Sequence, residues 1–367
     1  MKKFQKATVF MIAFLCMMIF TACKHEEEEE AANQNTVPAT SDTNYVVDIK
    51  ANGNNGIYLS NKGMVYYAML NFSGVGTTAI HGRVKGLSHI KKIALAVEGT
   101  GVGNYEGMAL DSNGNIYVWN LVYQTGADSA VLSPMMTYFT SGQLVDIAAA
   151  GYNSAAYYAL DHNGYVYGWG DNSKYQMGNG STVDVPVPTI ISIPASNIPI
   201  NRLAAGRSQA VAVTSTGLPF HWGTICFQLS EVYTTPQPVA GLSGVGAIDA
   251  GDNYNLAKKS TTGEVYIWGH VTDGYIPSLL NPIAMSAGAE TYFSPMFVLS
   301  DGTLVKCGFD MGTGNVTAPE SVTELSGYRF RLLAVSNRAF YVTSNGEILI
   351  QLSTGTAPLV INQPFTE

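Results

Sequence analysis

The sequence is poor in charged residues, and this shortage narrows the class of protein. Charged residues make up 13% of the 367 residues, whereas about a quarter is usual in soluble domains. Hydrophobic residues make up 46%, so the chain does not resemble the highly charged sequences that stay disordered. Lys and Arg number 19 against 27 Asp and Glu, giving a formal net charge of −8. Because phosphate backbones are bound by clustered basic residues, we expect no nucleic-acid partner.

Sequence motifs for common catalytic and metal sites are also missing. The six histidines form no pair with ligand spacing, and the abundant serines include no G-x-S-x-G motif. The segment Asp111–Asn115 hints at a calcium loop, but flanking helices and a later bidentate Glu are absent. We interpret it as a type I′ turn. The sequence therefore predicts no catalytic residue, no metal and no cofactor.

The first 23 residues have the pattern of an export signal. A basic start with Lys2, Lys3 and Lys6 precedes an uncharged run over 7–20, which is too short for a transmembrane helix. The run ends in Phe20-Thr21-Ala22-Cys23, which resembles a lipobox, the site at which bacterial lipoproteins are cleaved and acylated. We expect a signal peptide over 1–22, lipidation of Cys23 and anchoring to the outer membrane.

Five consecutive glutamates follow the predicted lipidation site. Glu26 to Glu30 repel one another and open a polar segment, so we expect an acidic flexible tether over 23–44. An acidic cluster at this place also resembles the export signal of surface lipoproteins in some Gram-negative bacteria. A plain acidic spacer explains the glutamates equally well. The sequence therefore does not decide on which side of the outer membrane the protein lies.

Beyond the tether, one hairpin unit recurs seven times. Each copy has a turn glycine between two segments of alternating apolar residues, at Gly63, Gly114, Gly164, Gly217, Gly263, Gly302 and Gly346. All four tryptophans stand five residues after such a glycine, where we expect them to pack one blade on the next: Trp119, Trp169, Trp222 and Trp268. The pattern predicts an all-β fold over 45–367, a seven-bladed β-propeller of four-stranded antiparallel blades.

The order of the copies bears on ring closure and on the cysteines. The first copy begins with an inner strand over 45–50 and the last ends with an outer strand over 358–362, so no blade would combine the two termini. A shifted boundary would instead give a shared closing blade, and the sequence allows both. Cys226 and Cys307 lie two blades apart, too far to bridge, so we expect two free, buried thiols.

The third copy carries a family resemblance. Trp169-Gly170 is followed by Asp171-Asn172-Ser173-Lys174-Tyr175-Gln176-Met177-Gly178-Asn179-Gly180, and this resembles W-G-x-N-x-x-G-Q-L-G-x-G of the regulator of chromosome condensation family. The resemblance extends over about residues 45 to 362 and implies a seven-bladed propeller. The family's histidine after Ala-Gly is missing from every copy. The best-known member activates a nuclear GTPase and binds chromatin, which an exported acidic lipoprotein would not do.

Two functions are compatible with this pattern. The first is a non-catalytic module that binds a protein or a glycan through one loop face, as secreted propellers of this family that inhibit β-lactamases do. Its expected binding face comprises Tyr105, Tyr152, Asp171, Tyr175, Tyr254, Tyr292 and Phe293. The alternative is a polysaccharide-active enzyme with carboxylates at the channel mouth, from Glu98, Asp171, Asp252 and Glu290. We favour binding by a monomer, because fold alone implies no chemistry.

Overall fold

The structure is a computed structural model. It describes residues 44–73, 76–97, 104–122, 126–127, 129–151, 154–195, 197–226, 231–252, 254–269, 273–288, 294–308, 315–335, 338–351, 357–361 and 365. All of these belong to one compact unit, Asn44–Glu367. The predicted signal peptide, Cys23 and most of the tether lie outside the described residues. No helix within the described ranges is long and apolar enough to cross a membrane.

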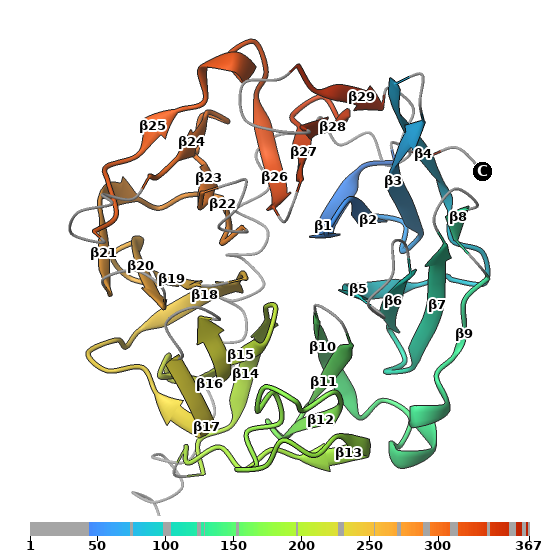
Figure 1. Cartoon of the computed structure of the whole chain (residues 1–367), viewed down its shortest axis with the longest axis vertical. Helices are drawn as coiled ribbons and strands as arrows, with labels where there is room; N and C mark the ends of the chain where they lie inside the picture. Colours follow the sequence, from blue (N-terminus) through green and yellow to red (C-terminus); the bar gives the residue numbers. More distant parts are fainter. Residues whose placement is uncertain are drawn as a thin grey trace, which may run out of the picture. The chain divides into compact units, whose positions relative to one another are not determined.

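Seven antiparallel sheets stand around a central axis, each built from consecutive strands (Figure 1). From the inner to the outer strand, the first three blades are β1 (Val46–Asn52), β2 (Asn55–Ser60), β3 (Val65–Ser73) and β4 (Gly76–Arg83); β5 (Ile90–Val97), β6 (Asn104–Asp111), β7 (Ile116–Val122), β8 (Gly126–Ala127) and β9 (Val131–Leu132); β10 (Leu144–Gly151), β11 (Ala155–Asp161), β12 (Val166–Gly170) and β13 (Val185–Ile190). The second blade has five strands because β8 and β9 both pair with β7.

The other four blades have four strands each. They are β14 (Ile200–Ala205), β15 (Gln209–Thr214), β16 (Pro219–Cys226) and β17 (Glu231–Pro238); β18 (Val245–Ala250), β19 (Tyr254–Lys259), β20 (Glu264–Gly269) and β21 (Gly274–Leu280); β22 (Ala284–Ser286), β23 (Met296–Val298), β24 (Leu304–Lys306) and β25 (Glu320–Ser321); β26 (Phe330–Val335), β27 (Ala339–Thr343), β28 (Ile348–Gln351) and β29 (Leu359–Ile361). The predicted fold is confirmed, and no blade combines the two termini.

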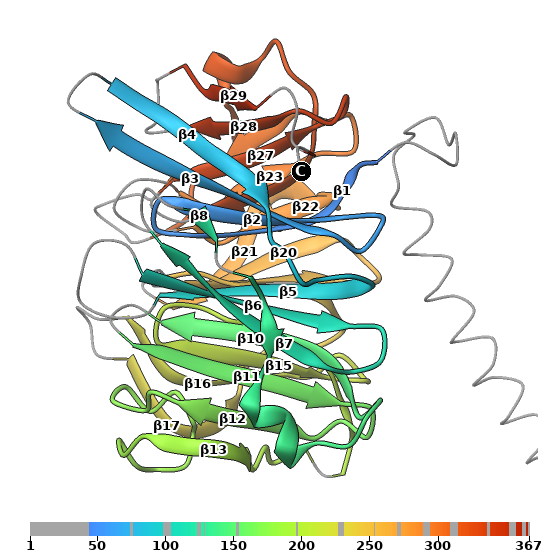
Figure 2. The ribbon, with the colours of Figure 1, turned by 90° about the vertical axis from the view of Figure 1, so that its right-hand side faces the viewer.

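The ring has two distinct faces, seen edge-on in Figure 2. The turn face holds the hairpins between the second and third strands and the connections from blade to blade. The loop face holds the connections between the first and second strands and between the third and fourth strands. Every inner strand therefore begins at the turn face and ends at the loop face.

The seven turn glycines all adopt the left-handed conformation, with φ between 69° and 93°. The type I′ turn predicted at Asp111 is wrong, because Ser112 and Asn113 do not have positive φ. The Asp111 carboxylate instead accepts hydrogen bonds from the backbone N–H groups of Asn113 (2.9 Å) and Asn115 (2.8 Å). These bonds support a right-handed turn that ends in one left-handed glycine.

The same glycines join neighbouring blades. The carbonyl of Gly164 accepts a hydrogen bond of 3.3 Å from Ile200, the first residue of the next inner strand, and Gly217 accepts one of 3.0 Å from Val245. A Cβ atom built on Gly164 would stand 2.5 Å from the Cβ of Pro199. On Gly346, in the last blade, it would meet nothing within 4 Å. Glycine is thus required for close packing at Gly164 and only for its conformation at Gly346.

The four indoles lie between blades. Each one is buried and shares an apolar cluster with the second strand of the preceding blade. Trp222 is 0% exposed and meets the Tyr158 ring edge-on, with the centroids 6.2 Å apart. Its Nε1–H donates to the carbonyl of Gln176 at 2.6 Å, whereas Trp119 Nε1 has no hydrogen-bond partner among the described residues.

The copies without tryptophan place smaller groups at the same position. Ala68 and Cys307 belong to interblade clusters, and buried Gln351 accepts a hydrogen bond from the Tyr341 hydroxyl at 2.7 Å. Cys307 is a free, buried thiol whose pKa is raised to about 12 by burial. The side chain of Cys226 lies outside the described residues.

The seam between the last and first blades closes through side chains. Tyr58 and Tyr66 stack with ring centroids 5.4 Å apart, and Phe365, near the C-terminus, presents its edge to both rings. Arg331 of β26 donates to the carbonyl of Val46 in β1. The two ends of the chain are thus held together without a shared sheet.

The burial of His221 beside Trp268 makes the free energy of unfolding depend on pH. The indole Nε1–H donates to His221 Nδ1 at 3.2 Å, and burial lowers the pKa of His221 from 6.5 to about 4. Between these two values the unfolded chain binds the proton and the folded chain does not, so this contribution is present above pH 6.5 and lost as the pH falls towards 4.

We expect wild type to lose on the order of 3 kcal/mol more of its unfolding free energy than His221→Asn between pH 7 and pH 4. Urea denaturation of both proteins at a series of pH values measures this difference. Parallel pH profiles for the two proteins would contradict the assignment. The comparison with the variant removes the effects of other titrating groups, which both proteins share.

Candidate binding site

The expected aromatic face is only partly present in the described residues. Tyr105 is half-buried at the start of β6, with its hydroxyl against Gly53 of the preceding blade. Tyr254 is 0% exposed and packs in the core between the fifth and sixth blades. Tyr254 is therefore corrected from a surface residue to a core residue. Tyr152, Tyr292 and Phe293 lie outside the described residues.

The connection between β12 and β13 lies on the loop face, and Asn172 organises it. The buried Asn172 amide Nδ2 donates to the carbonyls of Ser181 (2.8 Å) and Val183 (3.0 Å), and its Oδ1 accepts from the N–H of Met177 (2.9 Å). Its own backbone N–H donates to Asp184 at 3.0 Å. One side chain thus fixes both ends of the loop.

A second set of contacts attaches this loop to the fourth blade. The carbonyl of Gln176 accepts from the Tyr158 hydroxyl (2.8 Å) as well as from Trp222, and the Thr224 hydroxyl donates to the carbonyl of Lys174 at 3.1 Å. Gln176 Nε2 donates to Asp171 Oδ2 at 2.7 Å. This connection, residues 171–184, is called the platform loop, and its hydrogen bonds hold it against two blades.

Tyr175 occupies a strained position on this platform. Its φ is +61°, in the left-handed region, and the family motif has glycine at the same place. A non-glycine residue in this conformation costs about 1–2 kcal/mol. The side chain is half-buried, and the loop bonds hold its backbone on both sides, from the Tyr175 N–H to the Asn172 carbonyl and from the Gly178 N–H to the Tyr175 carbonyl. A bulky aromatic kept at such a cost points to a use beyond folding.

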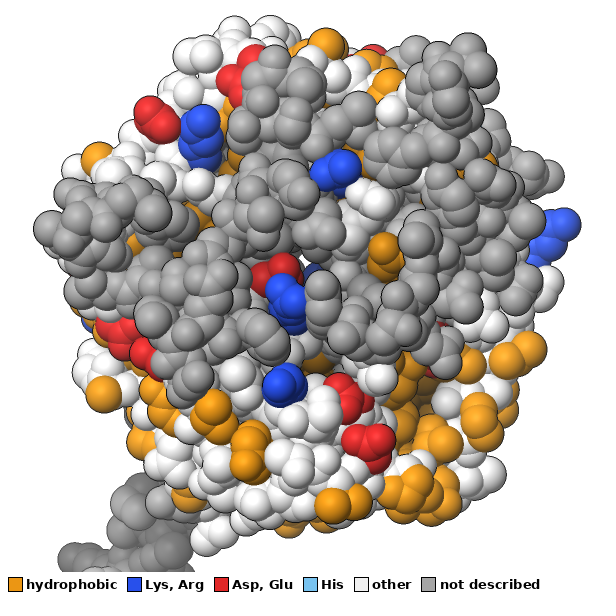
Figure 3. Space-filling view, in the orientation of Figure 1, with side chains coloured by type: hydrophobic (Ala, Val, Ile, Leu, Met, Phe, Trp, Pro, Cys, Tyr) orange, Lys and Arg blue, Asp and Glu red, His pale blue; other side chains and the backbone are white. Residues whose placement is uncertain are grey.

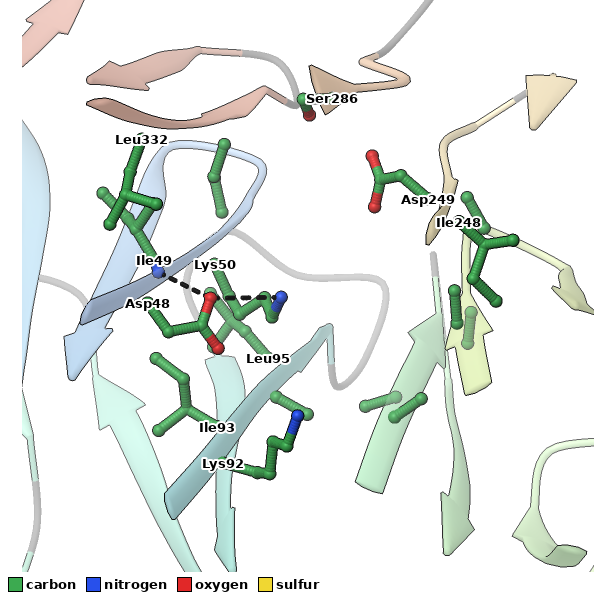
Figure 4. A pocket seen from close by; sticks show the side chains of 18 of the residues that line it. Asp48, Ile49, Lys50, Lys92, Ile93, Leu95, Ile248, Asp249, Ser286 and Leu332 are labelled. Carbon is green, nitrogen blue, oxygen red and sulfur yellow. Dashed lines mark hydrogen bonds and ion pairs between the residues drawn. The ribbon is translucent and has the colours of Figure 1, made fainter. Parts of the chain in front are cut away.

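The central channel forms a cavity of about 410 Å³ lined by inner strands of the ring (Figure 4). Lys50 Nζ lies 3.3 Å from Asp48 Oδ1, and Lys92 Nζ lies 3.9 Å from Asp146 Oδ1 on the next blade. Across the channel, Asp249 accepts the N–H of Ala287 at 2.7 Å. Sequence reasoning missed this group. The signal was the presence of charged residues at inner-strand positions that other copies fill with alanine.

The channel charges compensate one another. Burial raises the pKa values of Asp146 and Asp249. The pKa of Lys50 is also raised, mainly because the Asp48 carboxylate lies beside its ammonium group. Within the described ranges, no group of three His, Cys, Asp or Glu side chains is arranged to hold a metal ion. Acidic and basic side chains from the inner strands of four blades thus face one accessible channel.

The loop carboxylates of the enzyme hypothesis have structural contacts. Asp171 accepts from the N–H of Ser173 (3.0 Å) through one oxygen and from Gln176 through the other. Asp252 lies 4.0 Å from Arg207 of the preceding blade. Glu98 and Glu290 lie outside the described residues. Both described carboxylates thus have partners within the loop face.

Comparisons with known proteins agree with this geometry. The family model described as "Regulator of chromosome condensation (RCC1) repeat" matches residues 163–213, which include the platform loop. RUG3, a mitochondrial RCC1 domain-containing protein of Arabidopsis thaliana, is 31% identical over 163 residues, 41% of this chain and 36% of that protein. The E3 ubiquitin-protein ligase HERC2 of Mus musculus is 29% identical over 160 residues, 40% of this chain and 3% of that protein. The chain thus spans only a small part of these relatives.

Solved structures show the same fold. Yeast RCC1 (Prp20), in a crystal structure bound to Kap60, superposes with a TM-score of 0.53 at 18% identity, covering 74% of this chain and 72% of that one. A structure of Prp20p from Saccharomyces cerevisiae gives a TM-score of 0.51 at 19% identity, covering 74% of each chain. At this level of identity the likeness concerns the fold alone.

Proposed function

Because the chain carries a repeat of the regulator of chromosome condensation family within a seven-bladed propeller, we propose that it is a non-catalytic binding module of the bacterial envelope. Its loop face holds a protein partner. The N-terminal sequence pattern supports export and lipid anchoring at Cys23. The described carboxylates of the loop face have hydrogen-bond or ionic partners, which supports a structural role for them.

One observation carries the proposal: Tyr175 stands in a strained conformation on a rigid loop. Tyrosine offers a large contact area, a polar tip and a low entropy cost on binding, so it is enriched at the centres of interfaces. The hydrogen bonds of Asn172 and Gln176 order the loop in advance and reduce the entropy lost when a partner binds. A protein is favoured over a glycan because solved propellers of the same fold are seen with protein partners, as Prp20 is with Kap60.

Site-specific photo-crosslinking in the producing bacterium tests the proposal. A benzoyl-phenylalanine replaces Tyr175, and in a matched control it replaces Tyr165, which is 53% exposed in a hairpin of the turn face. We expect one protein adduct from position 175 and none from position 165. An adduct from position 165 alone would refute a loop-face site.

The protein identified by this adduct allows a separation-of-function test. Tyr175→Gly is expected to weaken its binding at least about tenfold, because an interface anchor is lost. The free energy of unfolding should change by less than about 1 kcal/mol, because relief of the left-handed strain offsets the lost contacts and the more flexible unfolded chain. Calorimetric titration measures the first quantity and urea denaturation the second. Unchanged affinity would exclude Tyr175 from the interface.

A further inference from the structure

An apolar patch lies on the outer rim where the second and third blades meet. It consists of Val131 and Leu132 in β9, Tyr138 at the end of the 3₁₀ helix η1 (Pro134–Tyr138), and Ile190 at the end of β13, and their exposed fractions are 59%, 53%, 54% and 53%. η1 contacts β13 and begins two residues after the end of β9, so the three elements are neighbours on the rim. Figure 3, which looks onto the loop face in the orientation of Figure 1, shows hydrophobic side chains along the lower right of the rim.

The patch lies within uncharged sequence. No Asp, Glu, Lys or Arg occurs over 129–145 or over 185–201, the two segments that form it. The four apolar side chains enter a lipid interface without the cost of desolvating an ion of their own. Its mixture of aliphatic side chains with an exposed tyrosine is typical of surfaces that sit at the boundary between headgroups and acyl chains.

The patch is on the side of the ring at which the chain enters. β9 and β13 are outer strands that run towards the turn face, and η1 belongs to the connection between two blades on that face. Asn44, the first described residue, leads into β1 at the same face. Cys23, the proposed lipidation site, precedes Asn44 by 21 positions in the sequence. A lipid on Cys23 would hold the propeller near the bilayer at a high effective concentration. Even a weak contact between the patch and the lipid would then form in a large fraction of the molecules.

We propose that this patch docks on the surface of the membrane to which the chain is anchored, with the turn face towards the lipid and the loop face pointing away. The inference rests on the proposed lipid anchor. It gives the anchor a geometric role, because a lipid on Cys23 does not by itself decide which face the propeller turns to the bilayer.

Charge selects the kind of lipid surface. The patch carries no cation and the chain has a formal net charge of −8, so apolar insertion drives docking and anionic lipids do not. We expect binding to neutral phosphatidylcholine vesicles that persists at high salt. Adding anionic phosphatidylglycerol should not strengthen it.

Vesicle sedimentation with an unlipidated chain tests the patch by itself. The mature chain carrying Cys23→Ser is mixed with phosphatidylcholine vesicles at millimolar lipid, and the triple variant Val131→Ser, Leu132→Ser, Tyr138→Ser is compared with it. We expect partitioning to fall at least about tenfold. The matched control is Val183→Ser with Val232→Ser, which removes two apolar side chains that are 72% and 41% exposed outside the patch and should bind as the parent does. Thermal melting verifies that all three proteins are folded.

Each outcome has a definite meaning. Absence of binding by the parent, or equal binding by the triple variant, would overturn the patch proposal. So would a parent that is dimeric in solution and becomes monomeric in the triple variant, because the patch would then join two copies. Incorporation of labelled fatty acid into wild type but not into Cys23→Ser cells tests the anchor separately, so failure of the anchor and failure of the patch give different results.

Discussion

Trp222→Ala is expected to lower the free energy of unfolding by about 3–5 kcal/mol. The indole is 0% exposed between the third and fourth blades, so its removal leaves a cavity that rigid neighbouring sheets cannot fill. The variant also removes one of the two donors that hold the Gln176 carbonyl and thereby the platform loop. Urea denaturation followed by far-ultraviolet circular dichroism measures the loss without relying on tryptophan fluorescence.

A pair of milder variants separates packing from hydrogen bonding. Trp222→Phe and Trp119→Phe remove similar volumes, but only Trp222 donates a hydrogen bond from its Nε1, since Trp119 Nε1 has no partner among the described residues. We expect Trp222→Phe to cost about 1 kcal/mol more than Trp119→Phe. Equal losses would show that the bond to Gln176 contributes nothing to stability.

The second large effect is expected at a turn glycine. Gly164→Ala should cost about 3 kcal/mol or more, because alanine is strained at φ +84° and its methyl group would overlap Pro199 of the next blade. Gly346→Ala meets the same conformational strain at φ +93° with no neighbour within 4 Å, and should cost only about 1–2 kcal/mol. The difference isolates the contact between blades.

The two variants are compared by urea denaturation under identical conditions. Equal losses at Gly164 and Gly346 would mean that the neighbouring blade moves aside freely. That result would contradict the view that close packing between successive blades requires glycine at these turns.

The fold was predictable because its signal is local and repeated. A turn glycine marks each hairpin in the sequence. A tryptophan stands five residues after four of these glycines, which indicates that the hairpins share one structural environment. Boundaries followed from the same pattern, as the inner strand predicted from residue 45 and the outer strand predicted to residue 362 match β1 and β29.

The site was less predictable because it depends on contacts between copies. Tyr254 and Tyr105 occupy the same place in their repeats, nine residues before the turn glycine, yet only Tyr254 is fully buried. The next blade has Cys307 where others have tryptophan, and the Tyr254 ring lies in the same cluster. A large residue in one copy thus compensates for a small residue in the next. A single copy of the repeat contains no sign of this.

The construction of every blade from consecutive strands has a consequence for the order of assembly. All strand pairing is local, so each sheet is able to form as soon as its own segment is available, without waiting for distant sequence. Only the seam must wait, because its aromatic contact requires Phe365, which follows the last strand of the last blade. Until that segment is available the protein is an open arc, and the docking of Phe365 converts the arc into a circle.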